Sequence, residues 1–257
     1  MSLHRSLCLA VSIALLAACQ PAEPPPAPEA SDAQADADAA AATAPAAEGM
    51  PVQEPSPDEI DFSLVPDFAW TLGDDAARVL GTASIYLAGK TELPEDHGLG
   101  TLPPSIDMAQ ATTIRFDVVE GLVGCAGDAP AYGPDGGQCA ATSTDVSASN
   151  GYSASKASNR TMYLVGVFPV APDAAKEVEA YVAPETDTET RVAPNANQVF
   201  LIGDGKTADG SLQTFVKHEG ATTLYLGFAD AYAFQGEPST YTDNQGHLRY
   251  SYTLDPK

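Results

Sequence analysis

The composition changes at about residue 60, and after residue 70 the chain alternates short runs of β-branched, aromatic and aliphatic residues with clusters of Gly, Pro, Asn and Asp. Runs bounded in this way predict strands, and apolar positions at helical spacing are scarce. About 190 residues with seven or eight strands can bury a single core, so we expect an all-β fold, an antiparallel β-sandwich or barrel. The runs are Thr82–Ala88, Thr112–Val119, Thr161–Phe168, Gln198–Ile202, Leu212–Val216, Thr222–Ala229 and His247–Leu254.

Two runs show the period-two alternation of a strand with one buried face. In the first, Ile114, Phe116 and Val118 are expected to face the core, with Arg115 and Asp117 on the other side. The last run predicts a similar division, with Leu248, Tyr250, Tyr252 and Leu254 facing inward and Arg249, Ser251 and Thr253 facing outward. Asp173–Tyr181 is the one plausible short helix, and it could equally be a loop that runs into a strand.

Residues 1–18 are typical of an export signal. A basic start, His4 and Arg5, precedes the apolar run Leu7–Leu16, which is too short to span a bilayer. The run leads into Leu16-Ala-Ala-Cys19, which resembles a bacterial lipobox, where the cysteine is lipidated and becomes the first residue. Ordinary secretion with cleavage nearby is the alternative.

Residues 19–57 are predicted to form a disordered tether. Pro, Ala and acidic residues dominate this stretch, which has no basic and no aromatic residue. It cannot bury enough apolar surface to offset chain entropy, and its prolines and like charges keep it extended. We therefore expect an exported lipoprotein, in the outer membrane or periplasm, whose Cys19 lipid anchors a domain of residues 58–257.

The net charge restricts the partners. With 12 Lys and Arg against 35 Asp and Glu, the formal net charge is −23. Nucleic-acid binding needs clustered basic side chains, so we expect no nucleic-acid partner. Many loop carboxylates instead suit divalent cations.

Two of the four cysteines, Cys125 and Cys139, lie in the expected domain. An exported domain with two thiols predicts a disulfide between them. The bridge would close a loop of about 15 residues, which stabilises by about 3 kcal/mol through chain entropy. Two free buried thiols are the alternative.

An oxygen-rich segment lies near the C-terminus. Asp230 follows an apolar run, and the turn Thr240-Tyr-Thr-Asp243-Asn244-Gln-Gly246 precedes the last strand. Carboxylate, amide and carbonyl oxygens on loops are the ligands that calcium prefers. Read locally, Asp-Asn-Gln-Gly is also ordinary hairpin chemistry, because Asn and Gly tolerate positive φ.

This segment resembles the C-terminal hairpin of the PA-IL-like calcium-dependent galactose-binding lectins. A second similarity lies upstream, where Ala131-Tyr132-Gly133-Pro134 follows a strand and looks like the tyrosine-glycine-proline loop of those lectins. The resemblance covers about residues 78–254 and implies a galactose-binding-like, jelly-roll type sandwich. The loop between Asp230 and Thr240 is longer than in the lectins, and it contains Tyr232 and Phe234, which either stack on a sugar or pack on the domain.

The resemblance implies a calcium site and a sugar site that share residues. Tyr132 and Thr240 would supply backbone carbonyls, Asp230 its carboxylate, and Asp243 and Asn244 loop oxygens. Two sugar hydroxyls would complete the shell of the ion, with Asp230, Thr240 and Asp243 next to the sugar. Calcium accepts six to eight oxygens, which leaves room for this sharing.

Sequence patterns for enzymes fail here. Gly151-Tyr-Ser153-Ala-Ser155 departs from the nucleophile-elbow pattern at its last position, and Phe200 stands where a phosphate loop needs its first Gly. We therefore expect no enzyme, although a glycosidase carboxylate pair stays possible in so acidic a chain. The prediction is calcium-dependent carbohydrate binding of the galactose type. The alternative is a non-enzymatic structural or protein-interaction surface lipoprotein, in which calcium stabilises the β-sandwich.

Overall fold

The structure, a computed structural model, describes residues 70–95, 97–171 and 178–257, which all belong to the compact unit Val52–Lys257. The predicted export signal, Cys19 and the tether lie outside the described residues.

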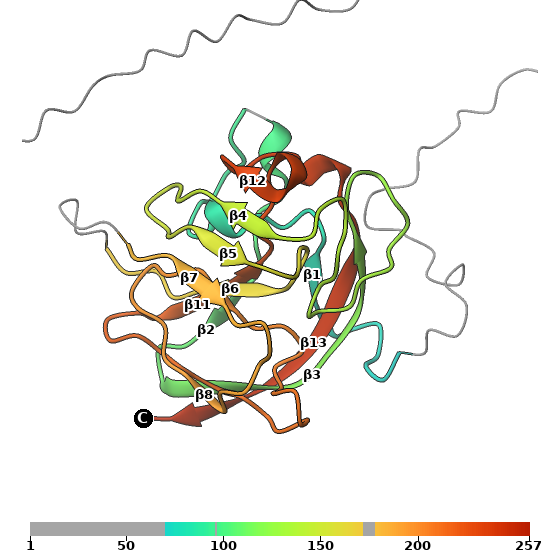
Figure 1. The fold of residues 1–257 in the computed structure, drawn as a ribbon. Coiled ribbons are helices and arrows are strands. Elements are labelled where there is room, and N and C mark those ends of the chain that lie inside the picture. The colour runs from blue at the N-terminus through green and yellow to red at the C-terminus, as the bar shows by residue number, and fades with distance from the viewer. Residues whose placement is uncertain (1–69, 96, 172–177) are drawn as a thin grey trace, which may run out of the picture. The chain divides into compact units, whose positions relative to one another are not determined.

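The described part is all-β, as the sequence predicts, with short 3-10 helices between the strands (Figure 1). The strands are β1 (Ala77–Leu80), β2 (Ser105–Asp107), β3 (Ala111–Gly124), β4 (Thr144–Val146), β5 (Ser155–Ala157), β6 (Val165–Val167), β7 (Tyr181–Ala183), β8 (Arg191–Val192), β9 (Phe200–Leu201), β10 (Thr214–Val216), β11 (Thr223–Gly227), β12 (Gln235–Gly236) and β13 (Gln245–Pro256). The 3-10 helices are η2 (Ile85–Leu87), η3 (His97–Leu99), η4 (Tyr232–Phe234) and η5 (Tyr241–Asp243).

The longest strands, β3 and β13, form the centre of a five-stranded sheet with the order β1-β13-β3-β10-β8 (Figure 1). They pair antiparallel from Gln245 opposite Gly124 to Pro256 opposite Ala111. Because β13 starts directly after η5, this register places the turn before β13 beside the end of β3. The ladder therefore brings together the two loops that the sequence singled out.

Two four-stranded sheets complete the described fold, with the orders β2-β11-β6-β9 and β12-β4-β5-β7. Most neighbouring strands are antiparallel, as predicted. Three pairs are parallel, namely β8 with β10, β12 with β4, and β5 with β7. The expectation of antiparallel sheets is therefore wrong for these three pairs. Each of them lies at the edge of a sheet and consists of strands of two or three residues.

The main core combines side chains from the five-stranded sheet with side chains from the β2-β11-β6-β9 sheet. Ile114 and Phe116 of β3 are fully buried, and so are Leu224 and Leu226 of β11. Phe116 packs edge to face on Phe215 of β10, with ring centroids 5.8 Å apart. Aromatic and branched residues thus fill the space between two sheets, which is what the alternation in the sequence predicts.

A β-bulge corrects the predicted alternation along β3. The register shifts between Ser251 and Tyr252 of β13, opposite Val118 and Phe116, so Asp117 is the extra residue. Val119 rather than Val118 is therefore the buried residue beyond the bulge. The prediction that Val118 faces the core was wrong. One inserted residue moves each later side chain of the strand to the opposite face of the sheet.

Two other predicted strands are only partly strands, or not strands at all, in the structure. Thr82–Ala88 does not form a strand but contains the 3-10 helix η2, whose three residues are all buried. In the predicted strand Thr161–Phe168, only β6 is a strand, and Thr161 forms an isolated bridge with Gly137. Residues 172–177 lie outside the description, and from Val178 the chain runs without helix into β7, so the loop-to-strand alternative holds for that part.

Two residues of β13 contradict the predicted division of faces. Tyr252 is predicted to face inward, yet it is 39% exposed, and Arg249 is predicted to face outward, yet it is only 6% exposed. Trp70 covers it, with the guanidinium carbon 3.9 Å from the ring centroid, and the same ring stacks on His247 at 5.2 Å. The Glu120 carboxylate accepts hydrogen bonds from the backbone N–H groups of Thr71 and Leu72 at 2.5–2.9 Å. The start of the described chain is thus fixed across β3 and β13 by a cation–π contact and charge-assisted hydrogen bonds.

Cys125 and Cys139 form the predicted disulfide, with their Cα atoms 6.1 Å apart. Both residues are buried, and the Cys125 N–H also donates to Cys139 Sγ at 3.1 Å. The bridge fixes the loop that carries Tyr132 to the end of β3.

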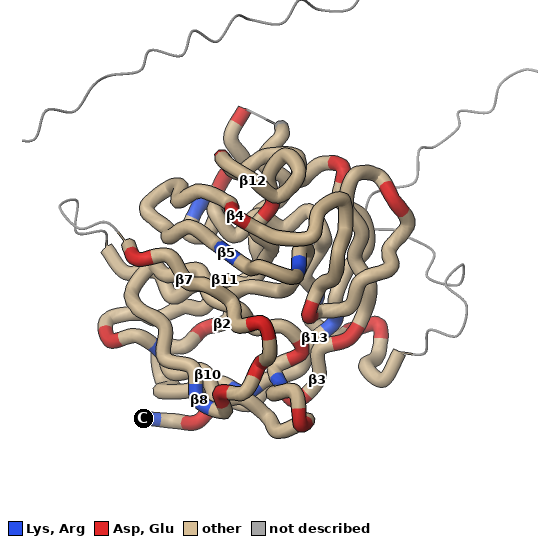
Figure 2. Tube along the Cα trace, viewed as in Figure 1, with Lys and Arg blue, Asp and Glu red and all other residues tan. Residues whose placement is uncertain are grey.

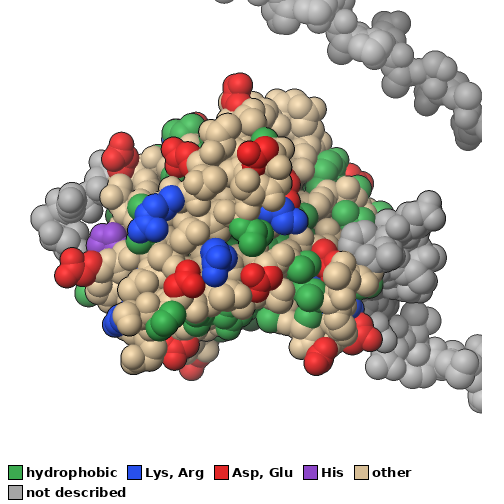
Figure 3. All heavy atoms as spheres, turned by 90° about the horizontal axis from the view of Figure 1, so that it is seen from below, with side chains coloured by type: hydrophobic (Ala, Val, Ile, Leu, Met, Phe, Trp, Pro, Cys, Tyr) green, Lys and Arg blue, Asp and Glu red, His purple; other side chains and the backbone are tan. Residues whose placement is uncertain are grey.

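Charged side chains are spread over the described surface. Figure 2 shows Lys and Arg dispersed among a larger number of Asp and Glu residues, and the face in Figure 3 likewise carries separate basic side chains between acidic ones. Among residues 70–95, 97–171 and 178–257, no helix has the length and apolar character needed to cross a membrane.

Candidate functional site

Asp230 and Asn244 meet at the point where β11 and the turn before β13 come together. Asp230 follows β11 by three residues and is 2% exposed, and Asn244 ends the 3-10 helix η5 and is 4% exposed. Asn244 Nδ2 donates to Asp230 Oδ2 at 2.8 Å and to the Gly81 carbonyl at 3.1 Å. The backbone N–H of Ala231 donates to Asp230 Oδ1 at 2.7 Å. Asp230 and Asn244, 14 residues apart, thus share one buried polar centre with Gly81, which lies 163 residues before Asn244.

The amide of Asn244 is only half satisfied. Both hydrogens of its Nδ2 atom have acceptors, but its Oδ1 atom is buried and has no hydrogen-bond partner. A buried carbonyl oxygen without a donor costs about 1–3 kcal/mol. An acceptor of this kind next to a carboxylate is a suitable ligand for a hard cation.

Burial raises the pKa of the Asp230 carboxyl from its ordinary value of 3.8 to about 7. Hydrogen bonds from Asn244, Ala231 and Thr240 oppose this shift, and the charge of Asp243 adds to it. The surroundings of Asp230 therefore contain a second carboxylate and neutral donors. Desolvation of the charged form outweighs those donors.

Tyr241 fixes the backbone at this centre. It is fully buried, its hydroxyl accepts from the Asp230 N–H at 2.9 Å, and it donates to the Phe228 carbonyl at 3.2 Å. Thr240, just before it, has a φ of 67°, a left-handed conformation that is uncommon outside glycine. The sequence does not reveal the roles of Tyr241 and Gly81, because nothing in the local pattern shows that a turn tyrosine reaches back to the end of the previous strand.

The loop that carries Tyr132 packs against the same turn. The Gly127 N–H donates to the Asp243 carbonyl at 2.7 Å, and Gln245 Nε2 donates to the Gly127 carbonyl at 3.0 Å. Tyr132 itself forms a bridge with Val123, whose N–H donates to the Tyr132 carbonyl at 2.9 Å. The two loops are neighbours, and one of the two lone pairs of the Tyr132 carbonyl is already used within the sheet.

Four of the five predicted metal ligands share one neighbourhood: Asp230, Thr240, Asp243 and Asn244. Asp243 is exposed, and its N–H donates to the Thr240 carbonyl at 3.1 Å within η5. Tyr132 lies in the adjoining loop, and the role of all five residues as metal ligands stays a prediction. His, Cys, Asp and Glu side chains do not gather in groups of three or more anywhere in the described part of the chain, so a metal site here would need amide and backbone oxygens as well.

Phe234 belongs to the long loop before Thr240, and it is 2% exposed within the main core. Tyr232, two residues earlier, is 81% exposed. The sequence left open whether these aromatic residues stack on a ligand or pack on the domain. Phe234 packs on the domain, and Tyr232 projects into solvent.

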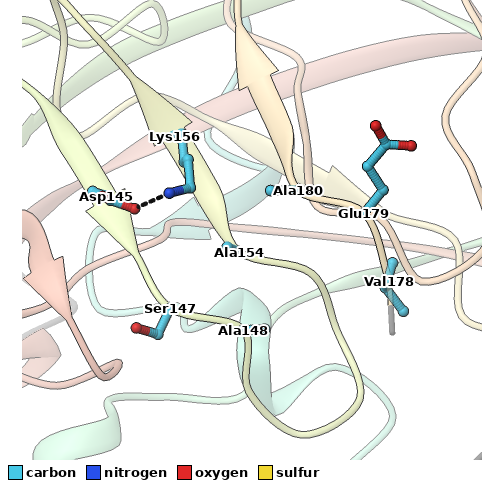
Figure 4. A pocket seen from close by; sticks show the side chains of 8 residues that line it. All are labelled: Asp145, Ser147, Ala148, Ala154, Lys156, Val178, Glu179 and Ala180. Atoms are coloured by element: carbon cyan, nitrogen blue, oxygen red, sulfur yellow. Dashed lines mark ion pairs between the residues drawn. The ribbon is translucent and has the colours of Figure 1, made fainter. Parts of the chain in front are cut away.

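A separate open pocket of about 420 Å³ lies on the β12-β4-β5-β7 sheet. Asp145 of β4 and Lys156 of β5 line it and form an ion pair at 2.7 Å (Figure 4). Both side chains are about half exposed, at 57% and 42%, so the pair is solvated and contributes little energy. The small residues Ala148, Ala154 and Ala180 form much of the remaining wall.

Comparison of the chain with protein-family models, curated proteins and solved structures gave no match. The geometry around Asp230 is therefore the basis for the proposed function.

Proposed function

We propose that this protein is an exported, lipid-anchored, lectin-like protein that binds a carbohydrate of the galactose type through a calcium ion. Its domain would be a β-sandwich of the galactose-binding-like type, preceded by a signal peptide and a tether. The shared core between the five-stranded sheet and the β2-β11-β6-β9 sheet supports the sandwich.

One observation carries the calcium proposal: a buried carboxylate and a buried amide oxygen without a partner lie side by side at the meeting point of two loops. Asp230 and Asn244 are in direct contact, and Asn244 Oδ1 has no donor. A divalent cation would satisfy both groups and would remove the desolvation cost that raises the pKa of Asp230. The chemistry of this donor set fits calcium, which prefers mixed oxygen ligands from loops.

The proposed ligands are the Asp230 carboxylate, the Asn244 side-chain oxygen, loop oxygens of Asp243, and the backbone carbonyls of Thr240 and Tyr132. Such a set leaves part of the coordination shell of calcium open. When bound, the ion would supply a positive centre for two vicinal sugar hydroxyls. Asp230, Thr240 and Asp243 would then act as hydrogen-bond acceptors and shape the rim of the site.

The burial of Asp230 favours a second function, in which the ion has a structural role. Both oxygens of Asp230 already accept hydrogen bonds, and its side chain is almost inaccessible. An ion at this position could therefore hold the loops of a structural or protein-interaction module without contacting sugar. The two functions differ in whether a sugar response accompanies calcium binding.

Calorimetric titration separates these functions. The purified full chain is titrated first with calcium and then, when calcium-saturated, with a panel of monosaccharides. We expect calcium binding below millimolar and heat release with a galactoside. Calcium binding without any sugar response would establish the structural alternative, and no calcium binding below millimolar would reject both.

The membrane partner of this proposal is a lipid bilayer bound through Cys19. Metabolic labelling with a fatty-acid analogue should modify the wild-type chain and leave Cys19→Ser unlabelled. Equal labelling of the two chains would reject the lipid anchor and leave the calcium proposal intact.

A further inference from the structure

Tyr232 is the most exposed large apolar side chain in the described part of the chain, at 81%. It follows Asp230 by two residues, so its Cα lies within about 7 Å of the Asp230 Cα. Single exposed apolar residues are common and by themselves indicate nothing. The loop around Tyr232 gives this one a different meaning.

The loop 231–239 is fixed at both ends and in the middle. Ala231 forms a bridge with Pro238, and the Ser239 N–H donates to the Asp230 carbonyl at 3.1 Å. The Tyr232 N–H donates to Ser239 Oγ at 3.2 Å. Ser239 thus links the backbone of Tyr232 to that of Asp230.

The middle of the loop is anchored in the protein. Phe234 is buried in the main core, and the next residues, in β12, pair with Asp145 and Val146 of β4. Ala233 and Phe234 have φ values of 50° and 57°, a left-handed conformation that is costly for residues with a side chain. Such strain persists only where the surroundings impose it, and it concentrates at functional sites. Here it separates an inward-facing Phe234 from an outward-facing Tyr232.

We propose that Tyr232 is the stacking platform of the sugar site, on which the apolar face of a pyranose packs while its hydroxyls reach the ion. This inference rests on the proposed function and assigns sugar affinity to a residue that does not bind calcium. It also explains the extra length of the loop, which positions an aromatic ring at the edge of the Asp230 centre.

The chemistry of a pyranose matches this arrangement. Its hydroxyls lie around the rim, and in galactose-type sugars several C–H groups share one face. The face of an aromatic ring carries partial negative charge and attracts such C–H groups in addition to excluding water. Because the backbone of the loop is fixed before binding, little backbone entropy is lost when the sugar contacts Tyr232.

The test measures affinity for methyl β-galactoside by calorimetry on the purified full chain at saturating calcium. Tyr232→Ala should weaken binding about three- to tenfold, and Tyr232→Phe, which keeps the ring, should stay within about twofold. Tyr252→Ala removes a partly exposed tyrosine of β13, 39% exposed, and should leave the affinity unchanged. Calcium affinity, measured separately, should be the same in all four proteins.

Three results would overturn the inference. If Tyr232→Ala binds the galactoside as the wild type does, Tyr232 has no role although the proposed function stands. If Tyr232→Phe loses as much as Tyr232→Ala, the hydroxyl and not the ring face is the contact. If the calcium-loaded wild type binds no galactoside, the inference fails together with the sugar part of the proposed function.

Discussion

The Oδ2 atom of Asp230 accepts a hydrogen bond from Nδ2 of Asn244 at 2.8 Å, and neither side chain is more than 4% exposed. The contact joins the end of β11 to the turn before β13. A carboxylate in such a place loses its hydration and gains only neutral donors in return. The negative charge of the Asp230 carboxylate is therefore not balanced by its hydrogen-bond donors, and a cation would balance it.

Asn244→Ala tests this pair from the amide side. The variant removes one donor from the buried Asp230 carboxylate and one from the Gly81 carbonyl. We expect the free energy of unfolding to fall by about 2–4 kcal/mol without calcium, and calcium affinity to fall at least tenfold. Denaturant unfolding and calcium titration measure the two effects. A variant with wild-type calcium affinity would show that Asn244 is not a ligand.

The stability of the calcium-free protein should depend on pH through Asp230. The pKa of this carboxyl is about 7 in the folded chain, against its ordinary 3.8, because burial disfavours the charged form. Between these values the folded state binds more protons than the unfolded state, so the free energy of unfolding contributed by Asp230 falls as pH rises from about 4 to 7. Above pH 7 the cost is fully present.

Calcium competes with this proton, so it should raise the melting temperature more at pH 8 than at pH 5. Thermal unfolding with and without calcium at the two pH values measures the difference. In Asp230→Asn the difference should disappear, because the titrating group is gone. An equal calcium effect at both pH values in the wild type would contradict the assignment.

Replacing both cysteines of the disulfide by serine should destabilise the domain. The bridge joins residues 14 positions apart, and opening such a loop costs about 3 kcal/mol through the entropy of the unfolded chain. Because the bridge also fixes the Tyr132 loop to β3, we expect weaker calcium binding as well. Denaturant unfolding of the double variant under oxidising conditions provides the check. Stability within 1 kcal/mol of the wild type would argue against this role.

Glu120→Ala should release the segment that begins at Trp70. It removes the acceptor of the Thr71 and Leu72 N–H groups, which should lower the free energy of unfolding by about 1–2 kcal/mol. Hydrogen exchange of these two amides should become faster. Asp117→Ala, which removes an exposed carboxylate from the same strand, is the matched control and should leave their exchange unchanged. Unchanged exchange in Glu120→Ala would show that other contacts hold the segment.

The sequence predicted the parts of the fold that depend on local pattern. Alternation identified β3 and β13, and the cysteine count identified the disulfide. It could not predict the bulge at Asp117, since one extra residue changes the face of Val118 and Val119 without changing composition. It could not predict that Trp70 would bury Arg249, because that contact joins residues 179 positions apart in the chain.

For the candidate site, the sequence predicted residue types and their order but not their environment. Asp230, Thr240, Asp243 and Asn244 do share one neighbourhood. The burial of Asp230, the unsatisfied oxygen of Asn244 and the anchoring by Tyr241 arise from packing between β11 and the turn, and no local pattern encodes them. Tyr232 is exposed and Phe234 is buried because the backbone is left-handed at Ala233 and Phe234. The sequence could not predict this conformation, because neither Ala nor Phe favours a positive φ.

Calcium titration of the wild type and of Asp230→Asn decides whether the Asp230 carboxylate binds calcium. Asp230→Asn keeps the shape of the side chain and removes its charge, Tyr132→Phe keeps the carbonyl that we assign to the ion, and Asp117→Asn removes a remote carboxylate. We expect calcium binding below millimolar in the wild type, Tyr132→Phe and Asp117→Asn, and its loss in Asp230→Asn. Wild-type affinity in Asp230→Asn, or no binding in the wild type, would show that Asp230 does not hold a calcium ion.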